Sequence, residues 1–155
     1  MEIEIWSNLI YAAGTTMAFA IVLQSHKRYL WVQGIIGTIG WAIYMLLKQL
    51  PGHSSFDANL AAALFVALAC ELMAMVVKQP ATILVIPSIF PLVPGLGMYL
   101  GMSKIIERSY EAGINILLTA AGDAAAIALG IMMITSIFRF IKIILRPAHW
   151  GRIEK

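Results

Sequence analysis

The chain has 155 residues, of which 61% are hydrophobic and only 12% are charged, and its formal net charge is +3. A soluble domain needs more charge than this to cover its surface, so the composition excludes an ordinary soluble protein. The cations lie at the ends of apolar segments and form no basic patch with exposed aromatics, which argues against nucleic-acid binding.

The first two apolar segments predict an antiparallel pair of transmembrane helices, over residues 6–24 and 29–47. Each is close to the ~20 residues of helix that cross a bilayer, and only four residues connect them. Because the chain opens on acidic residues, we expect the first helix to be retained and not a cleaved signal. The second helix carries Gly34, Gly37 and Gly40, and small residues at such spacing let helix backbones approach closely in lipid.

A third helix is predicted over residues 57–77, with Asp57 or the preceding serines capping its start. It is followed by Pro80 and by an apolar segment, residues 81–103, that contains Pro87, Pro91 and Pro94. Three prolines within eight positions should break a helix, since each lacks a backbone donor and clashes with the preceding turn. Broken helices in membranes line cavities or binding sites. The alternative is a kink that serves packing alone.

The fifth predicted helix covers residues 113–138 and carries Asp123 near its middle. Asn115, Thr119 and Asp123 are spaced by four, so they share one helix face. An ionisable group at this depth usually faces a cavity or a polar partner. We expect a hydrated face, the alternative being that Asp123 only hydrogen-bonds a neighbouring helix. The basic tail, residues 139–155, is expected to lie at the headgroup level.

Glu71 is the second acidic residue inside a predicted span, within two turns of Lys78. Two roles remain open for it: a structural pair with Lys78, or proton transfer, since an apolar setting raises the pKa of a carboxylate. Glu71 and Asp123 are therefore the candidates for proton coupling. The single Cys70 and three scattered histidines offer no ligand spacing, so we predict no metal and no cofactor.

The predicted fold is a single all-α transmembrane domain over residues 1–155, with five spans and the fourth broken. An outside N-terminus places eight lysines and arginines on the inner side and three on the outer, as the positive-inside rule requires. In a four-span alternative, residues 81–103 would re-enter the membrane. We expect the solute path to be lined by the broken segment and by the polar face of the fifth helix, through Pro87, Pro91, Pro94, Gly95, Gly97, Tyr99, Asn115, Thr119 and Asp123.

The proline-rich segment resembles a family signature. Residues 86–99 read Ile-Pro-Ser-Ile-Phe-Pro-Leu-Val-Pro-Gly-Leu-Gly-Met-Tyr, which is similar to the I-P-x-x-x-P-L-V-P-G-x-x-x-Y pattern of the threonine/serine exporter (ThrE) family. The pattern belongs to the second, C-terminal module of that family. Glu71, Ala74 and Pro80 precede it at matching spacings, and the small residues 124–130 follow. Ser88 stands where many relatives have glycine, a small change that leaves the expected break intact.

The resemblance implies a small stand-alone module that works with a larger subunit of the same family in a homo- or hetero-oligomer. It implies a secondary transporter or antiporter of the cell inner membrane, exporting threonine, serine or a small carboxylate such as succinate. No catalytic constellation is present, so we do not expect an enzyme. The alternative function is a non-transporting membrane scaffold that stabilises a partner protein.

Overall fold

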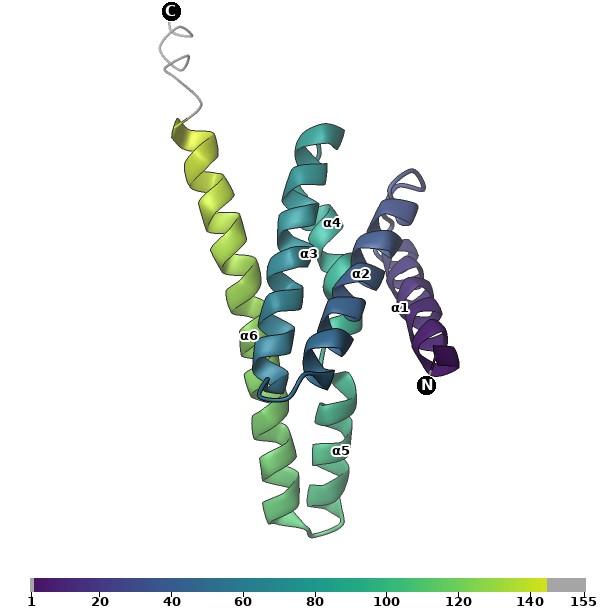
Figure 1. Cartoon of the computed structure of the whole chain (residues 1–155), viewed down its shortest axis with the longest axis vertical. Helices are drawn as coiled ribbons and strands as arrows, with labels where there is room; N and C mark the ends of the chain where they lie inside the picture. The colour runs from purple at the N-terminus through teal and green to yellow at the C-terminus, as the bar shows by residue number, and fades with distance from the viewer. Residues whose placement is uncertain (1, 145–155) are drawn as a thin grey trace, which may run out of the picture.

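The structure, a computed structural model, describes the backbone of residues 2–144 and the side chains of residues 6–144. The described chain is helical throughout and contains no strand, which confirms the all-α prediction. Figure 1 shows the helices as an elongated bundle in which α1 and α6 lie on opposite flanks. In chain order the elements are α1 (Glu2–Val22), α2 (Leu30–Gln49), α3 (Ser55–Val77), α4 (Ala81–Ile89), the short 3-10 helix η1 (Phe90–Leu92), α5 (Gly95–Ile106) and α6 (Tyr110–Ile144).

Local sequence signals set the start and end of α3. Ser54 is its N-cap and accepts a hydrogen bond from the amide of Asp57, whose side chain accepts one from the Ser54 amide in return. This reciprocal capping box satisfies two amides that a helix start leaves unpaired. The helix ends at Val77, and its C-cap residue, Lys78, adopts the left-handed conformation with φ of 56°. The predicted cap is therefore confirmed.

The glycines of α2 lie at its contacts with three other helices. A Cβ at Gly34 would lie 2.6 Å from Met17 of α1, and one at Gly37 would lie 3.0 Å from the Ser88 carbonyl of α4. A Cβ at Gly40 would clash with Val66 of α3. The expected close approach of helices at these glycines is confirmed.

The fourth segment is broken, as predicted, but the break has a particular position. Two helical parts, residues 81–92 and 95–106, meet at a bend of 49°. Pro94 precedes the first residue of α5, and Pro91 lies in η1. Pro87, in contrast, lies inside α4 without ending it.

A side chain from another helix explains why α4 tolerates Pro87. A proline has no N–H, so the carbonyl four residues earlier, on Ile83, loses its helical donor. Gln33 of α2 supplies the replacement, because its Nε2 donates to Ile83 O at 3.0 Å and to Ser25 Oγ at 2.8 Å. The Gln33 side chain is fully buried. The helix can therefore continue through Pro87 to the break.

The last helix is longer than predicted. α6 has 35 residues and runs to Ile144, so Arg139 and Lys142 belong to this helix and not to a separate tail. At 1.5 Å per residue it is about 50 Å long, well beyond a bilayer core of roughly 30 Å. Gly101 and Gly113, which have no side chain, let α5 and the first turns of α6 pack as a close hairpin. The remaining part of the predicted tail, residues 145–155, lies outside the described residues.

Three helices, α2, α3 and α6, are long and apolar enough to cross a membrane, and the bent α4–α5 pair would be a fourth span. In α1 the described apolar part, Trp6–Val22, is shorter. Many large apolar side chains on the helix surfaces are exposed, as expected of a protein that faces lipid. The helices are thus consistent with a membrane protein of three or four spans, while five spans stay a prediction.

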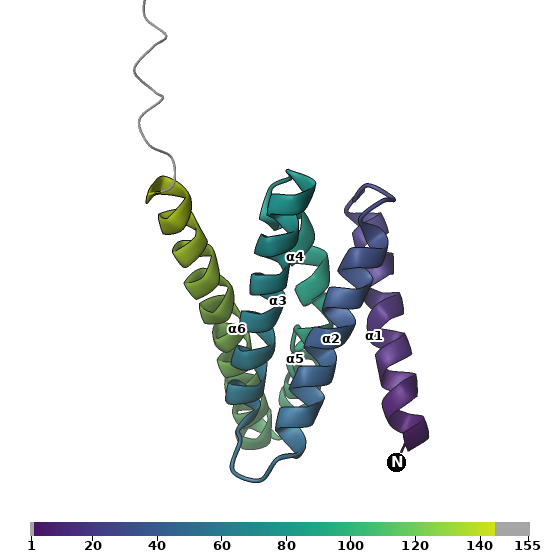
Figure 2. The same cartoon turned by 45° about the horizontal axis from the view of Figure 1, so that its top comes forward.

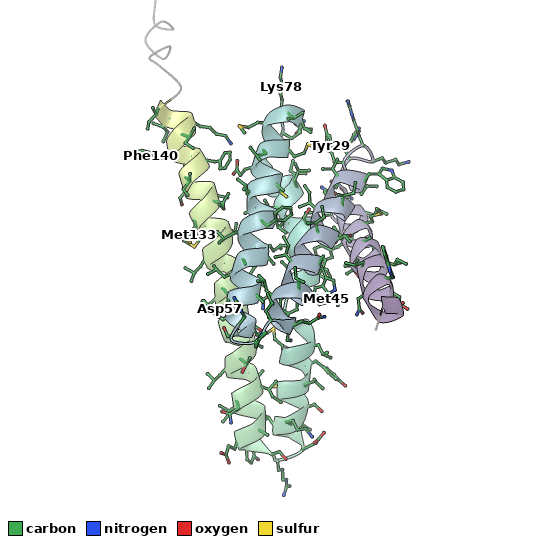
Figure 3. The ribbon with its side chains drawn as sticks, viewed as in Figure 1. Tyr29, Met45, Asp57, Lys78, Met133 and Phe140 are labelled. Atoms are coloured by element: carbon green, nitrogen blue, oxygen red, sulfur yellow. The ribbon has the colours of Figure 1, made fainter. Side chains whose placement is uncertain are left out.

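The predicted inner segments share one end of the bundle. Figure 3 shows Tyr29, Lys78 and Phe140 at the same end, and Figure 1 shows the start of α1 and the α5–α6 connection toward the other. The connections between helices therefore lie at alternating ends of the bundle, as in a chain that crosses it repeatedly.

Candidate functional site

A cavity of about 550 Å³ lies where the broken segment faces α2, α3 and α6. We call it the break cavity. Trp41, Tyr44 and Lys48 of α2 line one side, and Ser55 and Asn59 of α3 line another. The break itself and α6 supply the rest of the lining: Pro91, Leu92, Val93, Pro94, Leu96, Gly97, Ile116, Thr119, Ala120 and Asp123.

Asp123 lies beside the start of α3. Its Oδ2 accepts a hydrogen bond from Ser55 Oγ at 2.9 Å, and Ser55 is the first residue of that helix. A helix N-terminus carries partial positive charge, which favours a carboxylate nearby. Asp123 therefore both contacts a neighbouring helix and faces the cavity, so the two alternatives that the sequence left open are compatible.

Asn59, one turn further along α3, also lines the break cavity. Its Nδ2 donates to the Ser55 carbonyl at 3.1 Å, and the side chain is only 2% exposed. Its Oδ1 is buried and has no partner among the described residues. A buried acceptor without a partner is costly, so a ligand donor at this point would be favourable.

The start of α5 also opens on the break cavity. The helix begins at Gly95 with no side-chain cap, and Leu96 and Gly97 of its first turn line the cavity. The Gly95 amide donates to the Val93 carbonyl at 2.7 Å. The anion-favouring donors here are therefore the amides of Leu96 and Gly97, which like other first-turn amides lack an intrahelical partner and act together with the helix dipole. Gly97 also lies close to α6, since a Cβ there would be 3.2 Å from Ala120 Cβ. The cavity thus combines an anion-favouring end with the carboxylate of Asp123.

The structure brings five of the predicted path residues together and leaves four outside the cavity lining. Pro91, Pro94, Gly97, Thr119 and Asp123 line it. Outside it are Pro87, which is buried in α4, Tyr99, whose side chain is 70% exposed, and also Gly95 and Asn115.

Glu71 is paired differently from the expectation. Its Oε2 binds Lys142 Nζ of α6 at 2.9 Å, so the suggested pairing with Lys78 is wrong. Lys78 is exposed at the end of α3, and Figure 3 shows its side chain projecting beyond the bundle. Lys142 reaches Glu71 because α6 continues past residue 138.

Sequence reasoning missed Ser55 and Asn59 as cavity residues, and Gln33 as the support of the broken segment. Each is an uncharged polar residue in an apolar helix. Such residues are a weak signal on their own, because which face they occupy depends on the neighbouring helices. Among the described residues no group of three or more histidines, cysteines or acids is placed to hold a metal ion.

The sequence model of the family described as "Threonine/Serine exporter, ThrE" matches residues 8–137. The match covers most of the 155 residues and includes the broken segment and Asp123. The chain belongs to the ThrE family. No curated protein matches the chain. No solved structure matches it. ThrE membership and the apolar helices agree on a membrane transporter, and the break cavity lies at the segment that carries the ThrE-like motif.

Proposed function

We propose that the chain is a subunit of a proton-coupled secondary exporter, and that its solute, threonine or serine, binds in the break cavity. The observation that carries this proposal is the meeting of the uncapped α5 start with Asp123 and Asn59 in the lining of one cavity. Succinate and similar dicarboxylates are the alternative solute class.

The chemistry of the cavity matches an α-amino acid. The solute carboxylate would lie at the first amides of α5, where backbone donors and the helix dipole favour an anion. The solute ammonium would lie near Asp123 and Asn59 Oδ1, which are both acceptors. A dicarboxylate offers a second negative charge to Asp123 and no donor to Asn59. Lys48 of the lining would stabilise a carboxylate of either solute, so the preference for an amino acid over succinate rests on Asp123.

Asp123 is the first candidate for coupling to protons, with Glu71 as the second. Asp123→Asn keeps the size of the side chain and its ability to accept from Ser55, but removes titration. If Asp123 carries the proton, this variant retains solute exchange between the two faces and loses pH-driven accumulation.

Loss of exchange as well, with a raised half-saturating threonine concentration, would assign Asp123 to the solute ammonium instead. Both quantities are measured in vesicles at equal membrane expression. Wild-type accumulation in Asp123→Asn would contradict both roles.

Export through this chain is proposed to require a larger subunit of the same family, in the inner membrane. Exposed apolar faces can be covered by lipid, but exposed polar groups such as Asn115 on α6 favour a protein neighbour. We expect co-purification with a candidate large subunit, and threonine or serine efflux only when both are present. A scaffold function predicts instead that the partner exports at an unchanged rate per molecule without this chain.

The proposed topology has five spans, with the N-terminus outside. The broken segment supports a span over a re-entrant loop, because a bend of 49° keeps α5 heading away from the start of α4 (Figure 1). Under this topology the Glu71–Lys142 end of the bundle faces the cytoplasm.

A further inference from the structure

A second cavity, of about 740 Å³, lies at the other end of the α3–α6 pair. We call it the wedge cavity. Figures 1 and 2 show α6 diverging from α3 toward its C-terminal end, and the cavity lies between that part of α6, α3 and the first turns of α4. Most of its lining is apolar, with Val85, Ile86, Ile89, Ile131 and Ile143.

Three charged side chains line this apolar space. Glu71 is 5% exposed and is bound by Lys142 at 2.9 Å, while the Lys142 side chain is 51% exposed. Arg139, one turn earlier on α6, also lines the cavity and makes no ion pair with any described residue. The cavity therefore holds one buried carboxylate and two cations, of which only Lys142 is paired.

Packing alone gives a poor account of this cluster. A buried ion pair adds little stability over apolar residues of similar volume, because desolvation offsets the attraction. Here the pair opens on a cavity, and its cation is on a long, half-exposed stem that can move aside. The unpaired Arg139 presents a planar group that binds carboxylates with two parallel hydrogen bonds.

The cluster is complementary to a zwitterion. An ammonium can share Glu71 with Lys142, and the adjoining carboxylate can bind Arg139, so that opposite charges alternate. Thr135 adds a site for a hydroxyl, since it donates its own hydrogen to Ile131 O at 2.8 Å and leaves oxygen lone pairs free to accept. Anionic lipid headgroups would satisfy the cations but leave the buried Glu71 without an added partner. A phosphatidylethanolamine headgroup carries both charges, and the test below separates it from a free amino acid.

A close helix contact separates the wedge cavity from the break cavity. A Cβ on Gly130 of α6 would lie 2.8 Å from Ala63 Cβ and 3.2 Å from the Leu60 carbonyl of α3. Along α3 this contact falls between Asn59 and Glu71, which are about 18 Å apart at 1.5 Å per residue. The two cavities thus lie on the same helix pair, on either side of this contact.

We infer that the wedge cavity is a second binding site for a zwitterionic amino acid, with Glu71 taking the ammonium and Arg139 with Lys142 taking the carboxylate. The inference rests on the proposed export function, under which this end faces the cytoplasm. The site would then receive the solute before it passes the Gly130 contact toward the break cavity.

The test measures inhibition of labelled serine transport from each face of sided vesicles that contain the transport-competent assembly. The competitors are threonine, 3-hydroxybutyrate, which lacks the ammonium, and threoninol, which lacks the carboxylate. Glu71→Gln should raise the cytoplasmic inhibition constant of threonine about tenfold or more, as loss of a charged hydrogen bond does, and leave 3-hydroxybutyrate within about twofold. Arg139→Gln should raise the inhibition constant of threonine by a similar factor and leave that of threoninol within about twofold of its wild-type value.

Lys78→Gln is the matched control, because it removes a cation at the same end of the bundle that does not line the cavity. Lys78→Gln should leave the cytoplasmic inhibition constants of all three competitors unchanged. No variant should change the inhibition constants measured from the outer face. If Glu71→Gln raises the inhibition constants of all three competitors equally, the ion pair is a structural contact and the inference is overturned. If Glu71→Gln fails to fold, Arg139→Gln still decides, since Arg139 is exposed and unpaired with any described residue.

Two other outcomes separate this inference from the proposed function. Inhibition constants that depend on the phosphatidylglycerol or phosphatidylethanolamine content of the vesicles would identify a lipid site and overturn the inference alone. Failure of the wild-type assembly to transport serine or threonine would overturn the proposed function.

Discussion

At the scale of single residues, the contact between Gln33 and the Ile83 carbonyl lets the broken segment begin as a regular helix. Pro87 removes the donor that Ile83 would otherwise have, and Gln33 replaces it from a different helix. The two residues should therefore be energetically coupled. Pro87→Ala restores an amide at position 87, so that Gln33 becomes dispensable for the Ile83 carbonyl.

A double-mutant cycle measures this coupling. We expect Gln33→Leu to be less destabilising in a Pro87→Ala background than in the wild type, by about 1 kcal/mol, measured from unfolding in detergent. Gln33→Leu also removes Oε1, which is buried without a partner among the described residues, and this removal by itself is stabilising. The difference between the two backgrounds therefore measures the contact better than the stability of Gln33→Leu alone. Strictly additive losses would contradict the account.

At the scale of helices, the contact of α3 with α6 depends on the absence of a side chain at Gly130. Gly130→Val would press against the Leu60 carbonyl and the Leu64 amide, which are backbone atoms and cannot move aside easily. We expect a loss of about 1–3 kcal/mol in stability, as overpacking costs elsewhere. Thermal unfolding of the purified protein in detergent provides the measurement.

Gly122→Ala is the matched control on the same helix, where an added Cβ meets nothing within 4 Å. It should leave the protein as stable as before or more stable by up to about 1 kcal/mol, since alanine is the better helix former. Equal destabilisation by both substitutions would show that backbone propensity matters here and the helix contact does not.

The features that depend on neighbouring residues along the chain could be predicted from the sequence. The contacts between helices that are distant in the sequence could not. The capping box joins Ser54 to Asp57 within one turn, and the break at Pro94 follows from the properties of proline itself. The partner of Glu71 lies 71 positions away, on a helical extension that charge alone did not reveal. Five of the nine predicted path residues line the break cavity, but the α3 side of it, Ser55 and Asn59, could be recognised only in the packed bundle.

At the scale of the whole molecule, the alternating ends of the helices give a topology that can be measured. A cysteine at His53, in the α2–α3 connection, and one at Lys78 should react with a membrane-impermeant thiol reagent from opposite faces. The lysines and arginines at the Lys78 end favour the cytoplasm, so His53→Cys should react in intact cells and Lys78→Cys only after permeabilisation. Native Cys70 is fully buried, and the unmodified protein should stay unlabelled in both conditions.

Occupation of the break cavity by threonine or serine, as proposed, can be measured directly. Thr119→Cys places a thiol in its lining, and Asn115→Cys places one on the same face of α6, one turn away and outside the lining. Threonine at ten times its half-saturating concentration leaves about a tenth of the sites free by mass action, so it should slow alkylation of Thr119→Cys about tenfold. The rate for Asn115→Cys should stay within about twofold of its value without threonine. Alkylation of Thr119→Cys at the same rate with and without threonine, in an assembly that transports it, would contradict the account.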